Sequence, residues 1–258
     1  MSQTVCITGA SRGIGKALAD MYAKKGAVLI LASRAGEELD KLPSELKTVG
    51  AKEVYVVPCD FARGGAEVLK TFLQEKKLIP DIAILNAGLG AYGAFTSIPD
   101  EKNKEMIAVN MTALTSLAHF FANTMSTRKS GSILLTASTA AFEPGPLMTT
   151  YFATKAYVLS FGLALREELK AHGVHVSVLC PGATSTGFGA SAHAERTGVF
   201  NAKHMDTAEH VAKVAVAGIA KHKAIIVPGL KNKLTVFATR FVPRSFAANI
   251  VFRSFLKT

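Results

Sequence analysis

Short apolar runs alternate with longer helical patterns along this chain, and this alternation constrains the fold more than any other feature. Seven runs have the composition of β-strands: residues 5–8, 28–32, 54–58, 82–86, 133–136, 175–180 and 224–227. Several are almost continuously apolar, which is typical of parallel strands covered on both faces. The sequence therefore predicts an α/β fold, in which a doubly wound, seven-stranded parallel sheet is built with right-handed crossovers.

The length and composition suit one such domain. The chain has 258 residues, of which 49% are hydrophobic and 19% charged. This is an ordinary globular composition, and it excludes intrinsic disorder. A chain of this size buries roughly 70–75% of its unfolded surface, so it needs no disulfide or metal staple. No linker or repeat interrupts the alternation. We therefore predict a single domain over residues 1–229, followed by a helical basic extension over 230–258.

The cysteines, the histidines and the lengths of the apolar runs indicate the cellular compartment and whether a metal is bound. Cys6, Cys59 and Cys180 are odd in number and far apart, which is not a disulfide framework, and no C-x-x-C pair suggests zinc. The seven histidines show no metal-ligand spacing, so we expect no metal. We find no secretory signal and no run of about 18 apolar residues. These features favour a cytoplasmic protein.

A glycine-rich turn follows the first predicted strand and precedes a helix. Glycines there permit a tight turn, and the N–H groups and dipole of the helix start then face a pyrophosphate. The position of the turn predicts a dinucleotide site, although its spacing is GxxxGxG rather than GxGxxG. The predicted cofactor-binding residues in this segment are Gly9, Ser11, Arg12, Gly13, Ile14 and Gly15.

The same segment also matches GxSxG, the nucleophile elbow of α/β-hydrolases, with Ser11 as the nucleophile. An elbow needs an oxyanion donor from an earlier loop, and almost no chain precedes this strand. We therefore favour a phosphate or turn ligand at Ser11 and keep a serine hydrolase as a rival interpretation.

The end of the second predicted strand indicates which nucleotide is bound. An NAD site usually places an acidic residue about twenty residues beyond the glycines, to hold the ribose 2′-hydroxyl. Here Ser33 and Arg34 stand in its place, and Arg12 could reach the same corner. Because arginine forks match a phosphate, the pattern favours NADP over NAD.

A tyrosine and a lysine lie four residues apart, in a Tyr-x-x-x-Lys pattern. On a helix, Tyr151 and Lys155 share one face. A tyrosine hydroxyl has a pKa near 10, which is too high for easy proton exchange at neutral pH. A nearby ammonium stabilises the phenolate and lowers that pKa. Ser138 comes just after the fifth strand, at the edge where an open α/β sheet binds its ligand.

These motifs, taken together and in this order, resemble those of the short-chain dehydrogenase/reductase family over about residues 3–229. Thr184 is a mild departure, since the family often has an aliphatic residue there. The resemblance adds an adenine-contacting Asp60, an Asn-Ala-Gly segment, a helix asparagine and a Pro-Gly segment with a nicotinamide-contacting threonine. The residues added are Asp60, Asn86, Ala87, Gly88, Asn110, Pro181, Gly182, Thr184 and Thr186.

The resemblance implies a Rossmann domain that binds NADP (NADPH) over residues 1–229 and a set of catalytic roles. Tyr151 gives a proton to a substrate carbonyl, and Ser138 hydrogen-bonds the same oxygen. Lys155 binds the nicotinamide ribose and lowers the pKa of Tyr151, while Asn110 holds a water that links Lys155 to solvent and replaces the proton. Acid–base assistance of this kind is worth about 10²–10⁴-fold. The implied activity is NADPH-dependent reduction of a ketone to a secondary alcohol.

The substrate and the partners are less determined. An apolar pocket wall would favour a lipophilic ketone, such as a 3-oxoacyl chain or a sterol-like ring, and the loop 183–205 should help to shape it. A homodimer or homotetramer is common in the family. A non-catalytic NADP-binding sensor or scaffold on the same fold stays an alternative, whereas a nucleic-acid partner is not expected. The candidate wall residues are Leu89, Phe142, Pro144, Met148 and Phe188.

The extension over 230–258 is basic. The last acidic residue is Glu209, and the formal net charge of the chain is +11. Leu230, Leu234, Phe237 and Phe241 form a narrow apolar stripe at helical spacing. We favour a helical pair packed on the domain or on a subunit, and keep open an interfacial helix on an anionic membrane.

Overall fold

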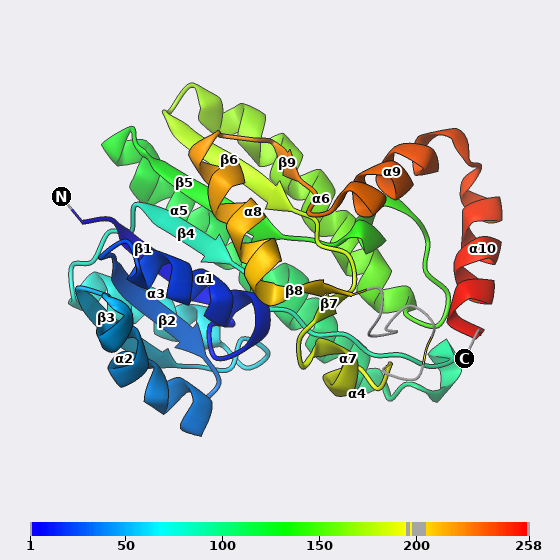
Figure 1. Ribbon diagram of the computed structural model, residues 1–258, viewed down its shortest axis with the longest axis horizontal. Helices are drawn as coiled ribbons and strands as arrows, with labels where there is room; N and C mark the ends of the chain where they lie inside the picture. Colours follow the sequence, from blue (N-terminus) through cyan, green and yellow to red (C-terminus); the bar gives the residue numbers. More distant parts are fainter. Residues whose placement is uncertain (1, 195–196, 198–204, 257–258) are drawn as a thin grey trace.

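Seven parallel strands form one sheet in the computed structural model, which describes residues 2–194, 197 and 205–256 (Figure 1). The strand order is β3-β2-β1-β4-β5-β6-β9, and every pairing is parallel. The predicted doubly wound sheet is therefore confirmed. The strands are β1 (Thr4–Thr8), β2 (Val28–Ser33), β3 (Glu53–Pro58), β4 (Ile82–Leu85), β5 (Gly131–Thr136), β6 (Val174–Leu179) and β9 (Ile225–Ile226).

Helices cover both faces of this sheet. On one face lie α1 (Gly13–Ala23), α2 (Glu37–Val49) and α8 (Ala208–Ala220), which share a core with inward residues of the strands. On the other lie α3 (Gly65–Glu75), α5 (Leu114–Arg128) and α6 (Thr149–Lys170). The helix α4 (Asp100–Ile107) runs into α5 through a π-helical turn, Ala108–Ala113.

Strand β2 shows why the apolar runs are continuous. Leu29 and Leu31 belong to the core under α1, α2 and α8, whereas Ile30 and Ala32 belong to the core on the opposite face. All four are fully buried. Because successive side chains of a strand point to opposite faces, a sheet covered on both sides needs an apolar residue at every position.

The strand order reverses between β1 and β4. The chain leaves β1 for one half of the sheet and returns to build the other half from β4 onwards. Helices on either side of such a reversal diverge, which opens a crevice at the carboxyl ends of the strands. The segments that follow β1, β4, β5 and β6 carry most of the predicted site residues, so the topology brings them to one edge.

The segment after β6 is only partly described. It contains the short strands β7 (Thr184–Ser185) and β8 (Asp206–Thr207), which pair in parallel, and the turn of helix α7 (Phe188–Ser191). Most of the remainder of the predicted loop 183–205, namely 195–196 and 198–204, lies outside the described residues.

The C-terminal extension is helical, as predicted, and consists of α9 (Leu230–Ala238), the 3₁₀ turn Thr239–Phe241 and α10 (Arg244–Leu256). Ala247, Val251 and Phe255 of α10 pack on the domain. The α9 stripe, in contrast, is 57–74% exposed from Leu230 to Phe241. Within the described residues, α10 thus packs on the domain, whereas the α9 stripe has no cover from it; the predicted subunit or membrane contact stays a prediction.

None of the helices in the described part of the chain is both long enough and apolar enough to cross a membrane.

Close packing of α6 on the sheet should be sensitive to side-chain volume. A Cβ on Gly162 would lie 2.5 Å from Val178 Cγ2 and 2.9 Å from Leu135 Cδ1. We expect Gly162→Val to lower the free energy of unfolding by about 1–3 kcal/mol, because the helix must move away from two buried strands. Chemical denaturation measures this loss. The exposed Ala164→Val on the same helix is the matched control and should change stability by much less.

Candidate active site

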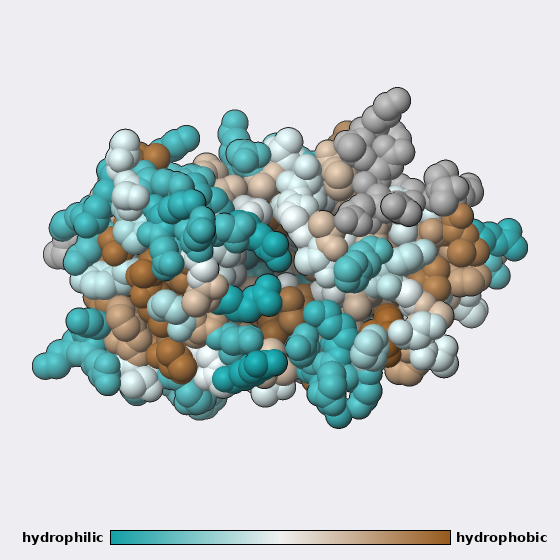
Figure 2. Space-filling view, turned by 90° about the horizontal axis from the view of Figure 1, so that it is seen from below, coloured by the Kyte–Doolittle hydropathy of each residue, from teal (hydrophilic) through white to brown (hydrophobic). Residues whose placement is uncertain are grey.

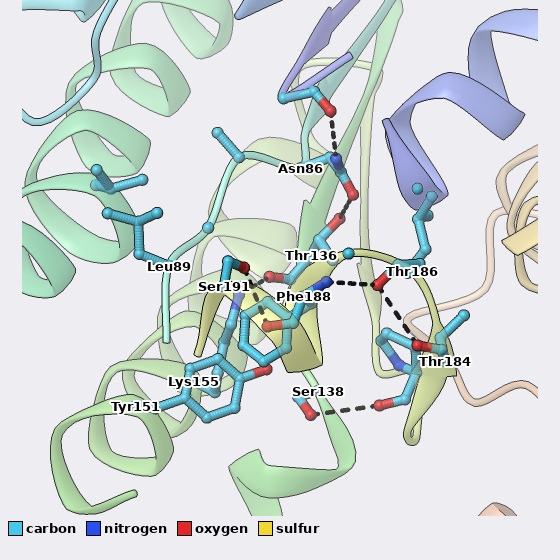
Figure 3. Close-up of a pocket in the computed structure, with 18 of the residues that line it drawn as sticks. Asn86, Leu89, Thr136, Ser138, Tyr151, Lys155, Thr184, Thr186, Phe188 and Ser191 are labelled. Atoms are coloured by element: carbon cyan, nitrogen blue, oxygen red, sulfur yellow. Dashed lines mark hydrogen bonds between the residues drawn. The ribbon is translucent and has the colours of Figure 1, made fainter. Parts of the chain in front are cut away.

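A cavity of about 590 Å³ lies at the carboxyl edge of the sheet (Figure 3). Segments that follow six of the strands, β1 to β6, line it, together with the start of α6 and part of α10. All the predicted site residues lie along its wall except Gly15 and Asn110, which stand just behind it. The topology thus gathers residues from positions 9 to 186 into one cavity.

The glycine-rich turn forms the floor at the β1 end. Gly9 and Gly13 have φ values of 66° and 57°, in the left-handed region that favours glycine. A Cβ on Gly9 would lie 2.9 Å from the Cα of Ala87, and one on Gly15 would overlap the carbonyl oxygen of Gly9. Gly15 therefore allows close packing of the turn rather than contact with a ligand.

Two features of this turn fit the pyrophosphate of a dinucleotide. Helix α1 begins at Gly13, so its free N–H groups and positive dipole end lie next to the cavity. The side chain of Asn86 donates to the carbonyl oxygens of Thr8 and Gly9, at 3.2 and 3.3 Å, which fixes the turn against β4. The residues present therefore fit a dinucleotide cofactor.

The end of β2 forms the corner expected to hold a ribose 2′-phosphate. Ser33 and Arg34 line the cavity there, and Ser11 Oγ lies 3.0 Å from Ser33 Oγ. Arg12 also lines the cavity, and its Nη1 lies 3.3 Å from where a Cβ on Gly187 would stand. The expected contact of Arg12 with the same phosphate stays a prediction.

Asp60 lies at the same end of the cavity, directly after β3. Its Oδ1 accepts a hydrogen bond from the backbone N–H of Ala62 at 2.9 Å, which orients the carboxylate. The expected contact of Asp60 with adenine requires a bound cofactor, so it stays a prediction.

In the described residues, no group of three or more His, Cys, Asp or Glu side chains could hold a metal ion.

Ser138 and Tyr151 face each other across the cavity wall, from the segment after β5 and the first turn of α6. The Ser138 hydroxyl donates to the carbonyl of Pro181 at 3.3 Å and accepts from the N–H of Ala140 at 3.2 Å. Burial raises the pKa of Tyr151 to about 12, although a hydrogen bond with Ser138 lowers it. Tyr151 is therefore a protonated donor at neutral pH.

Lys155 lies one helical turn further along α6 and is 4% exposed. Its Nζ donates to the carbonyl of Thr136 at 2.8 Å and lies 5.7 Å from the centre of the Tyr151 ring. Burial lowers the pKa of Lys155 to about 8, and the nearby thiol of Cys180 opposes this shift. Burial and the hydrogen bond with Ser138 account for the pKa of Tyr151 in this structure, and the expected lowering of that pKa by Lys155 stays a prediction.

Asn110 stands in the π-helical turn between α4 and α5 and is fully buried. Its Oδ1 accepts from the N–H of Leu89, while its amide group donates to the carbonyl of Leu89 and to Thr154 Oγ1, each at 2.9 Å. Both amide hydrogens are thus used to tie the β4 segment to α6. The water expected at Asn110 would have to use its remaining acceptors, and stays a prediction.

The far end of the cavity is apolar. The ring of Phe188 packs against Tyr151 with centroids 5.2 Å apart, and Phe255 of α10 contacts Phe152 at 6.2 Å. Leu89, Met148 and Phe188 line the cavity as predicted, whereas Phe142 and Pro144 do not. Glu143 also lines the cavity, and burial raises its pKa.

Several residues of the site escaped the sequence analysis. Thr136 offers the carbonyl that binds Lys155, and Thr154 fixes Asn110. Val251 and Phe255 close the apolar end from α10, nearly a hundred residues beyond Lys155. Thr154 lies inside the Tyr-x-x-x-Lys segment and could have been found there. The α10 contacts depend on the path of the chain, which no local pattern reveals.

The site combines a glycine-rich turn, a Tyr-x-x-x-Lys pair and a buried serine. This combination is typical of oxidoreductases that use a dinucleotide cofactor. The family model described as short chain dehydrogenase matches residues 3–197. This chain belongs to the short-chain dehydrogenase/reductase family.

Two curated relatives and one solved structure illustrate the likeness. The chain is 34% identical over 191 residues to 17-beta-hydroxysteroid dehydrogenase type 3 of Homo sapiens, covering 72% of this chain and 60% of that protein. It is 32% identical over 186 residues to the very-long-chain 3-oxoacyl-CoA reductase of Homo sapiens, covering 70% and 59%. A short-chain dehydrogenase from Sphingobium yanoikuyae in complex with NADPH superposes with a TM-score of 0.83 at 29% identity, covering 93% of each chain.

The matched segment spans about 60% of the length of these two curated relatives. Solved structures of similar fold hold either NADPH or NAD, so the likeness supports a nicotinamide cofactor without deciding between the two.

Burial of Lys155 should leave a signature in the pH dependence of stability. Its pKa is about 8 in the fold, against about 10.5 when it is exposed in the unfolded chain. Between these values the unfolded chain binds the proton and the folded chain does not, so this group makes stability rise with pH. Relative to Lys155→Met, the free energy of unfolding of the unaltered protein should rise by about 2–3 kcal/mol between pH 7 and 10.

Urea unfolding at several pH values measures this difference. Lys170→Met, which changes an exposed lysine on the same helix, is the matched control and should run parallel to the unaltered protein. If Lys155→Met also runs parallel to it, the lysine is not held in a dry site.

Proposed function

We propose that this protein is an NADPH-dependent oxidoreductase that reduces a lipophilic ketone to a secondary alcohol. The observation that carries the proposal is one cavity that contains both a glycine turn suited to a pyrophosphate and the pair of Ser138 and Tyr151 hydroxyls. Ketone reduction needs both parts next to each other, because the hydride donor and the proton donor must act on one carbonyl.

The residues of this chain do the binding and the proton work. When bound, the cofactor would supply a hydride to the carbonyl carbon. Ser138 and Tyr151 would hold the carbonyl oxygen between two O–H groups, which stabilises the negative charge that develops there. Tyr151, protonated at neutral pH, would then deliver its proton to that oxygen.

Lys155 would take its place beside the nicotinamide ribose. Its Nζ has only the Thr136 carbonyl as a hydrogen-bond acceptor among the described residues, so two of its three hydrogens are available for ribose hydroxyls. A positive charge there also favours loss of the Tyr151 proton, so that the ammonium helps when the phenolate has to form. Asn110 acts by holding the wall behind Lys155 in place.

The preference for NADPH rests on the end of β2. Ser33 and Arg34 border the cavity where an NAD site would place a carboxylate, and a guanidinium there attracts the additional phosphate. The preference for a lipophilic ketone rests on the apolar end of the cavity, formed by Phe188, Met148 and the inner face of α10. Two relatives of the chain support the same substrate class, because their names describe action on hydroxysteroids and on very-long-chain 3-oxoacyl-CoA.

The cofactor preference is tested by reversing the charge at the corner. Arg34→Asp should weaken NADPH at least tenfold, because it opposes the 2′-phosphate with like charge, and should leave NADH within about threefold. Fluorescence titration gives both dissociation constants. The exposed Lys52→Asp, on the neighbouring β3 side, is the charge-matched control. Equal affinities of the unaltered protein for NADPH and NADH would contradict the preference.

The proton donor is tested by deleting one oxygen atom. Tyr151→Phe should lower kcat for ketone reduction by about 10²–10⁴-fold while NADPH binds as before, because only the transferable proton is lost. Steady-state consumption of NADPH with a panel of apolar ketones measures the rate. The control is Tyr157→Phe, at a tyrosine six residues after Tyr151 on α6. This change removes a hydroxyl that contacts Thr115. Near-normal reduction by Tyr151→Phe would assign the proton to another group.

A further inference from the structure

Large apolar side chains are exposed mainly on the C-terminal extension. Among the described residues, thirteen large hydrophobic side chains are exposed, and eight of them lie on α9, α10 or the turn between them. Scattered single exposures are normal, but a cluster of this kind marks an interaction surface. We call these eight residues the tail surface: Leu230, Leu234, Phe237, Phe241, Phe246, Ile250, Phe252 and Leu256.

Both helices lie at one end of the molecule, away from β1–β3 (Figure 1). Viewed from below, apolar side chains gather at that end, with hydrophilic groups at its edge (Figure 2). Along α9 and the 3₁₀ turn that follows it, the exposed residues recur every three to four positions from Leu230 to Phe241, so they form one continuous face. No residue of α9 is buried, so this face has no partner within the described chain.

The charges around the tail surface have a single sign. Lys231, Lys233, Arg240, Arg244 and Arg253 are all exposed, and no acidic residue occurs after Glu209. These side chains have long apolar stems, which can lie along a buried stripe while the charged ends reach outward. The surface is therefore complementary to a partner that is apolar inside and negative at its border.

The extension of a second copy of this chain does not have that chemistry. A twofold interface through the extension would bring the same five cations of each copy together, with no carboxylate on either extension to pair with them. Like charges brought together in this way oppose association. An anionic lipid bilayer, in contrast, offers acyl chains to the stripe and negative headgroups to the cations.

The lengths of the helices decide how the extension would lie. Helix α9 has 9 residues and α10 has 13, and about 20 are needed to span the hydrocarbon core. The extension would therefore lie in the headgroup region, parallel to the membrane surface.

Helix α10 connects this surface with the cavity. Val251, Ser254 and Phe255 line the apolar end of the cavity, while Ile250 and Phe252, which flank Val251, are exposed. One helix thus separates the cavity from the outer surface. A protein seated on a bilayer through α9 and α10 would hold the apolar end of its cavity next to the lipid.

We propose that the tail surface binds the surface of an anionic lipid bilayer, with the α9 stripe in the headgroup–acyl boundary and the flanking lysines and arginines on the lipid phosphates. This binding does not depend on the proposed ketone reduction.

Co-sedimentation with vesicles tests the proposal on the full chain without cofactor or substrate. Vesicles of phosphatidylserine and phosphatidylcholine should bind the protein at least tenfold more tightly than phosphatidylcholine alone. The affinity should fall about tenfold or more between low and high salt, because the cations are exposed to screening.

Two double variants assign the binding to the tail surface. Leu230→Ser with Leu234→Ser removes part of the stripe and should weaken vesicle binding at least tenfold. Val68→Ser with Ile79→Ser makes the same kind of change at exposed sites outside the extension and should bind normally. Circular dichroism and the melting temperature confirm that both fold.

The charge contribution has its own matched pair. Lys231→Glu with Lys233→Glu should abolish the preference for phosphatidylserine, whereas Lys52→Glu with Lys76→Glu makes the same change in net charge elsewhere on the surface and should keep it. Tyr151→Phe should bind vesicles like the unaltered protein, which separates this proposal from the proposed reaction.

Either of two results would overturn the proposal. One is that the protein ignores anionic vesicles at low salt. The other is that the control variants lose binding as much as the tail variants do. If the protein ignores anionic vesicles, its oligomeric state is compared with that of the Leu230→Ser/Leu234→Ser variant. Dissociation of an oligomer in this variant would assign the surface to a second copy of the chain.

Discussion

Asn86 fastens the ends of three parallel strands to one another, and the active site depends on this connection. Its backbone N–H donates to Thr8 Oγ1 and its side chain donates to the carbonyls of Thr8 and Gly9. Its Oδ1 lies 3.5 Å from Thr136 Oγ1. One side chain thereby links β1, β4 and β5 where the strand order reverses, so that the glycine turn and the carbonyl that holds Lys155 keep a fixed relation (Figure 3).

Burial of polar groups then gives the site its chemistry. Lys155 and Asn110 are buried and Tyr151 is partly buried, and each has defined polar partners among the described residues. A dry environment strengthens every electrostatic interaction with a substrate carbonyl, and it also makes the lysine costly to charge. The polar half of the cavity and its apolar half meet at Tyr151, whose hydroxyl faces Ser138 and whose ring packs on Phe188.

Local patterns in the sequence predicted the sheet and nearly all of the polar site, because each motif depends on its own strand end and the strand ends converge. The path of the extension was harder to predict. The stripe from Leu230 to Phe241 has the spacing of a packed helix, yet it is exposed, while the less regular α10 supplies Val251 and Phe255 to the cavity. Helical spacing shows that a helix has an apolar face, but not what covers it.

The most direct test of this account is a single turnover. Protein saturated with NADPH is mixed rapidly with a series of apolar ketones of increasing size, and the loss of NADPH absorbance is followed together with alcohol formation. The account predicts that at least one ketone is reduced with one equivalent of alcohol formed for each NADPH oxidised at the site. Tight binding of NADPH without oxidation by any ketone of the series would contradict it, and would leave a protein that binds the cofactor without using Tyr151 as a proton donor.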